Sequence, residues 1–216
     1  FYTFTSRLGL DVTGPDIGKA RSSAKIETDF GGFSGSNTML RIRQAYVNLD
    51  WGKSAVLVGI TWHPLFGAVM PDVLNLSTGA PFQPFNRSPQ IRYQYKANSR
   101  VQLMASVLWQ LQYLSSGPKG MSEDYIKNSC IPEMFVGADF TPADGWLMGL
   151  GAHMISLKPR TSTEWKEQTF KVNERMTAFS YEAHLKYSGR NYTFAAKTLM
   201  ASALDHTALL GGYGVS

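Results

Sequence analysis

The feature that most restricts the fold of this 216-residue chain is an alternation of apolar and polar side chains in ten short segments. In VQLMASVLWQLQY, residues 101–113, every second residue from Val101 is apolar and most of the residues between them are polar. A period of two residues is typical of a β-strand whose two faces meet different surroundings. The other segments are residues 6–13, 23–30, 40–49, 54–63, 90–96, 133–140, 146–157, 179–187 and 192–201. The sequence therefore predicts an all-β fold of about ten strands.

The connections between these segments alternate between short and long. The short ones are rich in Gly, Pro, Asn and Asp, which favour tight turns. They are residues 14–19, 50–54, 96–100, 141–145 and 187–191, and the long ones are residues 31–38, 64–87, 114–131 and 158–175. This sorting predicts an antiparallel transmembrane β-barrel with short periplasmic turns and long extracellular loops, because such barrels have tight turns at one end only. A β-sandwich gives no reason for loop length to differ between its two ends.

Composition agrees with a membrane barrel and argues against other classes of protein. Charged residues make up 17 % of the chain, below the roughly 25 % of an average soluble domain. The net charge is +5, but the basic residues are spread singly, so we expect no nucleic-acid partner. A single cysteine, Cys130, excludes an intrachain disulfide framework. The longest nearly unbroken apolar run, residues 146–157, is shorter than the 18 to 20 residues, roughly, of a spanning helix.

Two arginines inside an apolar strand indicate the surroundings of its two faces. Leu40 and Ile42 alternate with Arg41 and Arg43, and a guanidinium in a dry core would need a partner. In a barrel, the apolar residues face outer-membrane lipid and the arginines face a water-filled lumen, where they stay hydrated. Trp or Tyr near the ends of several apolar faces, Trp62 among them, suits an aromatic girdle at the membrane boundary. The alternation slips near Gln44 and Asn48, which predicts either a β-bulge or a contact with protein there.

The polar faces supply the predicted pore-lining residues, and the loop of residues 64–87 supplies a predicted constriction. The pore-lining residues are Arg7, Lys25, Glu27, Asp29, Arg41, Arg43, Arg92, Lys96, Glu182 and Lys186. The loop is apolar, contains four prolines, and carries charge only at Asp72 and Arg87. Loops of this length without their own secondary structure are usually functional. We expect it to narrow the pore or to pack at a trimer centre, and the alternative is an ordinary packed outer loop.

No motif in the sequence predicts catalysis, a cofactor or a metal. His63, His153, His184 and His206 form no zinc-binding motif, so we expect them to be scattered over the lumen and loops. Ser22 and Lys25 spell S-x-x-K, but the motifs that accompany it in penicillin-binding proteins are missing. We therefore expect a protein that is not an enzyme, with no catalytic, cofactor-binding or metal-binding residues.

Three stretches carry a resemblance to a known family. SRLGLDVTGPD, AKIETDFGG and LRIRQAYVNLDWGKSAVLVGITW resemble, in this order, the first strands of Gram-negative trimeric porins, in particular the DcaP-like group. The resemblance covers about residues 6–66. It implies a 16-stranded homotrimer whose extracellular loops fold inward, with an arginine-lined channel that favours small anions such as dicarboxylates. Arg7, Arg41 and Arg43 match lumen-facing arginine positions of that family.

Together these patterns predict that residues 1–216 form a single outer-membrane β-barrel domain, an incomplete one that is part of a 16-stranded barrel. The expected function is that of a porin for small hydrophilic solutes. Anion preference is expected to be mild, because Glu27 and Asp29 share the polar face with the basic residues. Two alternatives stay open: a barrel that anchors a larger surface complex and has a plugged lumen, and a soluble all-β ligand-binding protein.

Overall fold

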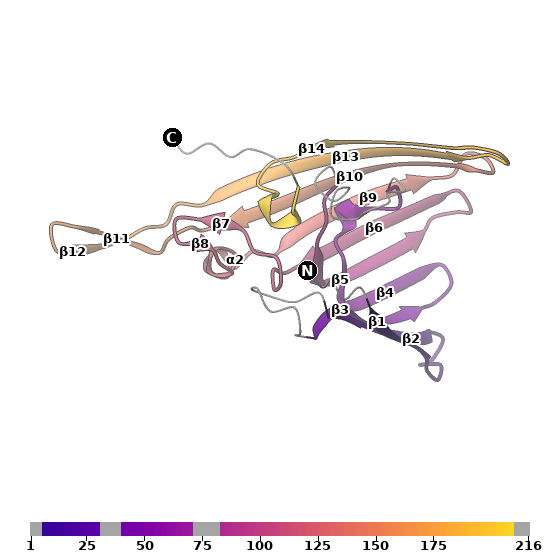
Figure 1. Ribbon diagram of the computed structural model, residues 1–216, viewed down its shortest axis with the longest axis horizontal. Coiled ribbons are helices and arrows are strands. Elements are labelled where there is room, and N and C mark those ends of the chain that lie inside the picture. Colours follow the sequence, from indigo (N-terminus) through magenta and orange to yellow (C-terminus); the bar gives the residue numbers. More distant parts are fainter. Residues whose placement is uncertain (1–5, 31–39, 71–82, 210–216) are drawn as a thin grey trace.

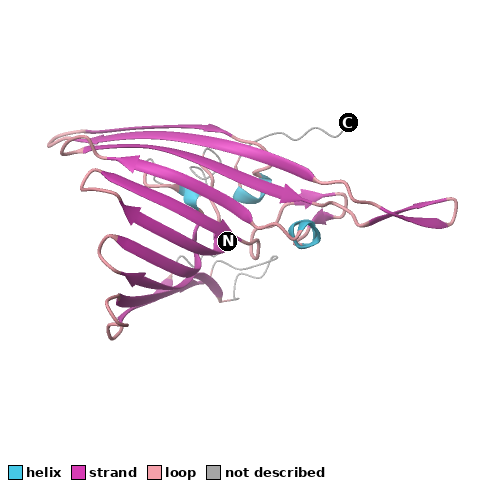
Figure 2. Ribbon diagram, turned by 180° about the vertical axis from the view of Figure 1, so that it is seen from behind, coloured by secondary structure: helices cyan, strands magenta, loops and turns pink. Residues whose placement is uncertain are grey.

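The fold is one curved antiparallel sheet of ten strands, each paired with the next strand of the sheet along the chain (Figures 1 and 2). The computed structural model describes residues 6–30, 40–70 and 83–209. The strands of this sheet are β1 (Arg7–Thr13), β2 (Arg21–Asp29), β3 (Arg41–Asp50), β4 (Ser54–Trp62), β5 (Arg87–Lys96), β6 (Val101–Leu108), β9 (Glu133–Phe140), β10 (Trp146–Leu157), β13 (Met176–Ser188) and β14 (Thr193–Met200). The ten predicted segments correspond one to one with these strands, so the predicted all-β antiparallel fold is confirmed.

Shorter elements lie in the connections. They are the 3₁₀ helices η1 (Pro64–Phe66) and η3 (Asp205–Thr207), the hairpins β7 (Ser116–Gly117) with β8 (Gly120–Met121) and β11 (Ser162–Trp165) with β12 (Gln168–Lys171), and the helix α2 (Asp124–Ser129). The tight turns gather at one end of the sheet, and the β11–β12 hairpin projects beyond the strands at the other (Figure 1). Within the described residues, no helix has the length and apolar character needed to cross a membrane.

Two details of the strands differ from or refine the sequence pattern. β6 ends at Leu108 rather than at residue 113, because the Gln110 side chain turns inward and its amide bonds Ser115 and Glu133. In the β2–β3 pair, Glu27 lies opposite Gln44 and Thr28 opposite Ile42, which leaves Arg43 as an extra residue. This is the predicted bulge, and it explains why the alternation slips at this point.

The two faces of the sheet differ in chemistry. Register places apolar side chains next to one another across the outer face, and Val47, Val58 and Ile91 form one such row, each about half exposed. The inner face carries the polar residues and is partly covered by η1 and η3 (Figure 1). A buried apolar cluster of Leu65, Leu108, Phe135 and Leu204 fixes these coverings to the wall. Among the described residues, β1 and β14 do not pair with each other, so the sheet is open between them.

Candidate functional site

The arginines of β3 belong to an ion-pair network on the inner face. Arg43 donates to Glu27 Oε1 at 2.6 Å and to Asp29 Oδ2 at 2.8 Å, while Arg41 bonds both carboxylate oxygens of Asp29 at 2.9 and 2.8 Å. The Arg43 side chain is only 5 % exposed. The expectation that Arg43 is hydrated is therefore wrong, because two carboxylates and not water compensate its charge.

The remaining basic residues predicted to line the pore differ in their partners. Lys25 bonds Asp11 at 3.1 Å, and Arg7 at the start of β1 is exposed. Arg92 donates to Trp62 O at 2.6 Å and to Gln90 Oε1 at 3.0 Å. Two further lysines, Lys96 on β5 and Lys186 on β13, lie toward the tight-turn end of the sheet.

The two charged residues of the 64–87 loop have separate outcomes. Asp72 lies outside the described residues. Arg87 is buried at the start of β5, where it donates to Tyr113 Oη at 2.9 Å and lies 5.1 Å from the Trp62 ring centroid. Trp62 also lies beneath the Arg43 guanidinium, at 5.9 Å. Its expected place in an aromatic girdle is therefore wrong, because its ring packs against buried arginines.

The segment that follows β4 crosses the inner face and is fixed to the opposite wall. Leu65 of η1 is fully buried against Leu108, Phe135 and Leu204. The Lys197 ammonium on β14 donates to the carbonyls of Leu65 and Phe66. The segment thus spans from β4 to β14, strands that have five others between them in the sheet order.

A second segment, after β14, packs beside the first. In η3, the carbonyl of Thr207 accepts from Phe85 N at 2.6 Å, and the carbonyl of His206 accepts from Asn86 Nδ2 at 3.2 Å. Ser116 N donates to Asp205 Oδ2 at 2.5 Å. Residues far apart in the sequence therefore meet on the inner face, where polar contacts hold them together.

A cavity of about 350 Å³ lies between the η1 segment and the wall. Arg92 of β5 lines one part of it, and Asp139 and Glu182 of β9 and β13 line another. His184 lies between these two carboxylates, with one ring nitrogen 3.3 Å from each. The cavity therefore has a basic group on one strand and acidic groups on two others. Charged groups on the wall of a cleft attract solutes of opposite charge.

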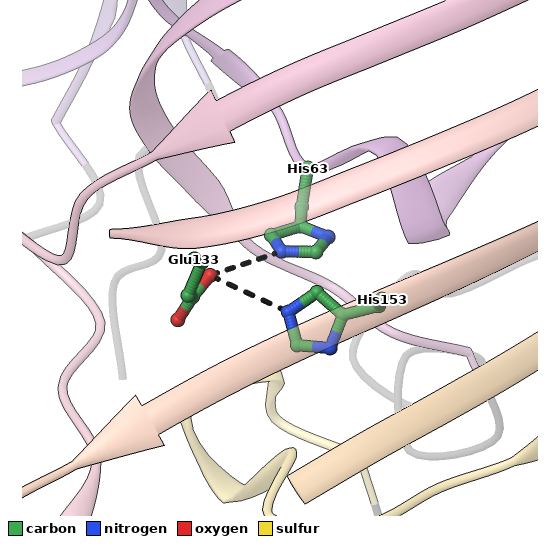
Figure 3. A group of neighbouring side chains, drawn as sticks. All are labelled: His63, Glu133 and His153. Atoms are coloured by element: carbon green, nitrogen blue, oxygen red, sulfur yellow. Dashed lines mark hydrogen bonds and ion pairs between the residues drawn. The ribbon is translucent and has the colours of Figure 1, made fainter. Parts of the chain in front are cut away.

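Beside the cavity, three of the four histidines meet around the buried carboxylate of Glu133. His63 and His153 point to this carboxylate, with their Nε2 atoms 3.3 and 3.8 Å from Oε2 (Figure 3). His206 Nε2 lies 2.8 Å from Oε1, which also accepts from Gln110 at 2.9 Å. We call His63, Glu133, His153 and His206 the histidine cluster. The expectation of scattered histidines is wrong, because the chain folds over the inner face and brings them together.

Burial and charge set the protonation of two of these rings. Burial lowers the pKa of His63 to about 4, despite the nearby Glu133 carboxylate, so the ring is neutral at pH 7. Burial also lowers the pKa of His206, but the charge and contact of Glu133 together with the charge of Asp205 outweigh this effect, and the net shift is upward. His206 therefore holds its proton more strongly than an ordinary histidine and stabilises the Glu133 carboxylate.

Comparison with known proteins supports the fold class. Neither family models nor curated proteins show a match to the chain. Among solved structures, the chain is similar to OmpTdeltaL8, the loop L8 deletion mutant of OmpT, an outer membrane protein of Vibrio cholerae, with a TM-score of 0.53 and 14 % identity. The likeness covers 92 % of this chain and 63 % of that one, so the chain spans less than two thirds of its length. The fold is thus that of a bacterial outer-membrane protein, which agrees with the predicted location in the outer membrane.

The sequence contains no motif that could reveal the histidine cluster. His63 and Glu133 are 70 residues apart, and His153 and His206 come from strands and loops still further along the chain. One signal was present: His153 is a polar residue inside the apolar run of residues 146–157. A buried imidazole in such a run requires a polar partner from another element, but the sequence does not say which.

Proposed function

We propose that the chain is part of an outer-membrane porin of the DcaP-like kind, which allows passive diffusion of small hydrophilic solutes with a mild preference for anions. The observation that carries this proposal is the cavity on the polar inner face, bounded by the η1 segment and by Arg92, Asp139 and Glu182. A pore needs a polar wall and a narrow region where charged groups act on the solute at short range. In the proposed porin, the wall belongs to a 16-stranded barrel and three such barrels form a homotrimer in the membrane.

The proposed constriction is the segment of residues 63–68, which belongs to the predicted loop. It lines the cavity, and its attachment to Lys197 and to the apolar cluster of Leu65 keeps it inside the curved sheet. The apolar outer face supports a lipid-facing surface, because exposed rows of Val and Ile are unfavourable in water. Passive diffusion along such a path needs no catalytic residue and no cofactor.

The anion preference would depend mainly on Arg92. Arg92 lines the cavity, and among the described residues the hydrogen-bond partners of its guanidinium are a carbonyl and an amide oxygen, both uncharged. Arg41 and Arg43, by contrast, are compensated by Asp29 and Glu27. Because acidic residues lie opposite Arg92, the net preference for anions is expected to be small.

Planar-bilayer recording of the purified full-length protein tests this proposal. We expect stepwise conductance in triplets, with a reversal potential across a tenfold salt gradient that favours anions. Arg92→Gln should move the reversal potential toward cations. The matched control is Lys19→Gln, which removes the same charge from an exposed tight turn and should leave the potential unchanged.

Other outcomes would contradict the proposal in distinct ways. Conductance without selectivity, and equal behaviour of Arg92→Gln and the wild type, would refute the anion preference alone. A folded barrel that shows no conductance would refute the porin. Such a result would favour the alternative of a plugged membrane anchor, in which η1 and η3 fill the lumen.

A further inference from the structure

The histidine cluster has the donor set and the geometry of a transition-metal site. Zinc and non-haem iron sites commonly use two imidazoles and one carboxylate and keep further positions open. In the cluster, His63, Glu133 and His153 each offer one ligand atom, and these atoms all lie within 4.8 Å of one another. The three residues come from the end of β4, the start of β9 and the middle of β10, so they approach one point from three elements (Figure 3).

One of the distances between the ligand atoms equals that around a small divalent cation, and a second is slightly longer. With metal–ligand bonds of 2.0 to 2.1 Å, two ligand atoms of a tetrahedral site are about 3.3 Å apart. His63 Nε2 lies at this distance, 3.3 Å, from Glu133 Oε2. His153 Nε2 lies 3.8 Å from the same oxygen. A metal at this point would therefore require the His153 ring to move closer to Glu133 Oε2.

His153 supplies an independent observation that points to a ligand. The residue is fully buried, yet neither of its ring nitrogens makes a hydrogen bond within the described part of the chain. Buried polar groups without a partner are rare and require an explanation, such as a bound ion. The unsatisfied Nε2 atom is the one that faces Glu133 Oε2, so a cation between them would satisfy both.

The groups around Glu133 also have the arrangement that supports a metal-binding carboxylate. Oε2 faces His63 and His153, while Oε1 lies 2.8 Å from His206 Nε2 and accepts from Gln110 at 2.9 Å. The hydrogen bond from Gln110 is of the kind that usually fixes the orientation of a ligating carboxylate, and His206 adds an ion-pair contact. One oxygen is thus positioned by the protein, while the other accepts from His63 Nε2 at 3.3 Å, the hydrogen bond that a cation would replace.

We propose that His63 Nε2, Glu133 Oε2 and His153 Nε2 bind a divalent transition-metal ion such as Zn²⁺, with His206 and Gln110 as outer partners of the carboxylate. The metal would join the segment after β4 to β9 and β10, and so attach it to the wall. In this structure His63 Nδ1 accepts from Leu65 N at 3.2 Å, so the proton of the neutral ring lies on Nε2. Metal binding replaces that proton and moves it to Nδ1 at the expense of this one long hydrogen bond. The site does not depend on whether the barrel conducts.

Titration of the purified full-length barrel in detergent with Co²⁺ tests the site, because tetrahedral Co²⁺ has visible d–d absorption bands. We expect binding of one Co²⁺ per chain, displacement by Zn²⁺, and a higher thermal unfolding temperature with Zn²⁺ than with EDTA. His153→Gln is the decisive variant, since loss of a ring that makes no hydrogen bond should leave the fold intact. Removal of outer-shell partners typically costs 10- to 100-fold in affinity, so loss of this direct ligand should cost at least about 100-fold.

His184→Gln is the matched control, because His184 lies between Asp139 and Glu182 in the cavity and outside the cluster. It should bind Co²⁺ as the wild type does. Heat-modifiable migration on gels verifies the fold of each variant, and His63→Gln takes the place of His153→Gln if that variant does not fold. The proposal is overturned if the wild type binds no Co²⁺ or Zn²⁺ at millimolar concentration, if His153→Gln binds as tightly as the wild type, or if His184→Gln alone abolishes binding.

Discussion

Replacement of Arg43 by methionine tests how strongly the inner wall depends on its buried ion pairs. Methionine keeps much of the side-chain volume and removes the charge, so Glu27 loses the guanidinium that donates to it at 2.6 Å. Asp29 retains both hydrogen bonds from Arg41. Removal of one partner from a buried ion pair costs about 3–5 kcal/mol, because the other charge stays buried without compensation. Since Asp29 keeps a partner, we expect a loss near the lower limit, about 3 kcal/mol.

The assay is reversible urea unfolding of the full-length protein in detergent, followed by tryptophan fluorescence. A matched control is Arg21→Met, which breaks an ion pair of similar length, 3.0 Å to Asp50, but at a side chain that is 73 % exposed. Exposed pairs contribute about 0–1 kcal/mol, so this variant should unfold almost as the wild type does. The double variant with Glu27→Gln and Arg43→Met should be more stable than the sum of its single changes predicts, by roughly 1–3 kcal/mol. Equal stability of Arg43→Met and Arg21→Met would refute the reasoning, because Arg43 would then be solvated.

Two further predictions concern the segment after β4. Leu65→Ala should lower the free energy of unfolding by about 2–5 kcal/mol, because Leu65 is fully buried and its truncation leaves a cavity. Urea unfolding measures this loss. A loss below about 1 kcal/mol would show that the segment does not pack on the wall. With EDTA present, the free energy of unfolding should fall as the pH drops from about 6.5 toward 4. In this range the unfolded chain protonates His63, while the folded ring, with a pKa of about 4, stays neutral. The slope should reach up to about 1.4 kcal/mol per pH unit. His63→Gln should remove this part of the slope, and the same slope in both proteins would contradict the assignment.

The sequence predicted the sheet because strand patterns and turn residues are local. A period of two residues specifies a strand with two different faces, whatever the strand pairs with. Turn residues at 14–19, 50–54, 96–100, 141–145 and 187–191 specify which strands are joined tightly, and therefore which are neighbours. The irregular alternation near Gln44 and Asn48 predicted a bulge or a protein contact, and the β2–β3 register has a bulge beside Gln44.

Only the tertiary structure decided which side chains contact one another on the inner face. The pattern assigned Arg43 to the polar face, but its partners depend on the register that places Glu27 and Asp29 beside it. The pattern placed Trp62 at the membrane boundary, whereas its ring lies near the guanidinium groups of Arg43 and Arg87. A period of two residues states the face of a side chain and nothing about its neighbours on that face.

The histidine cluster shows the same limit most clearly. Its members are far apart in the sequence, and they meet because η1 and η3 fold back over the wall and pack on Leu108 and Phe135. Such contacts arise from packing between segments whose order along the chain does not determine their distance in space. The sequence by itself therefore determined the strands, their order and their two faces, which depend on neighbouring residues. Only the tertiary structure decided which polar groups are buried together, because burial and pairing depend on long-range contacts.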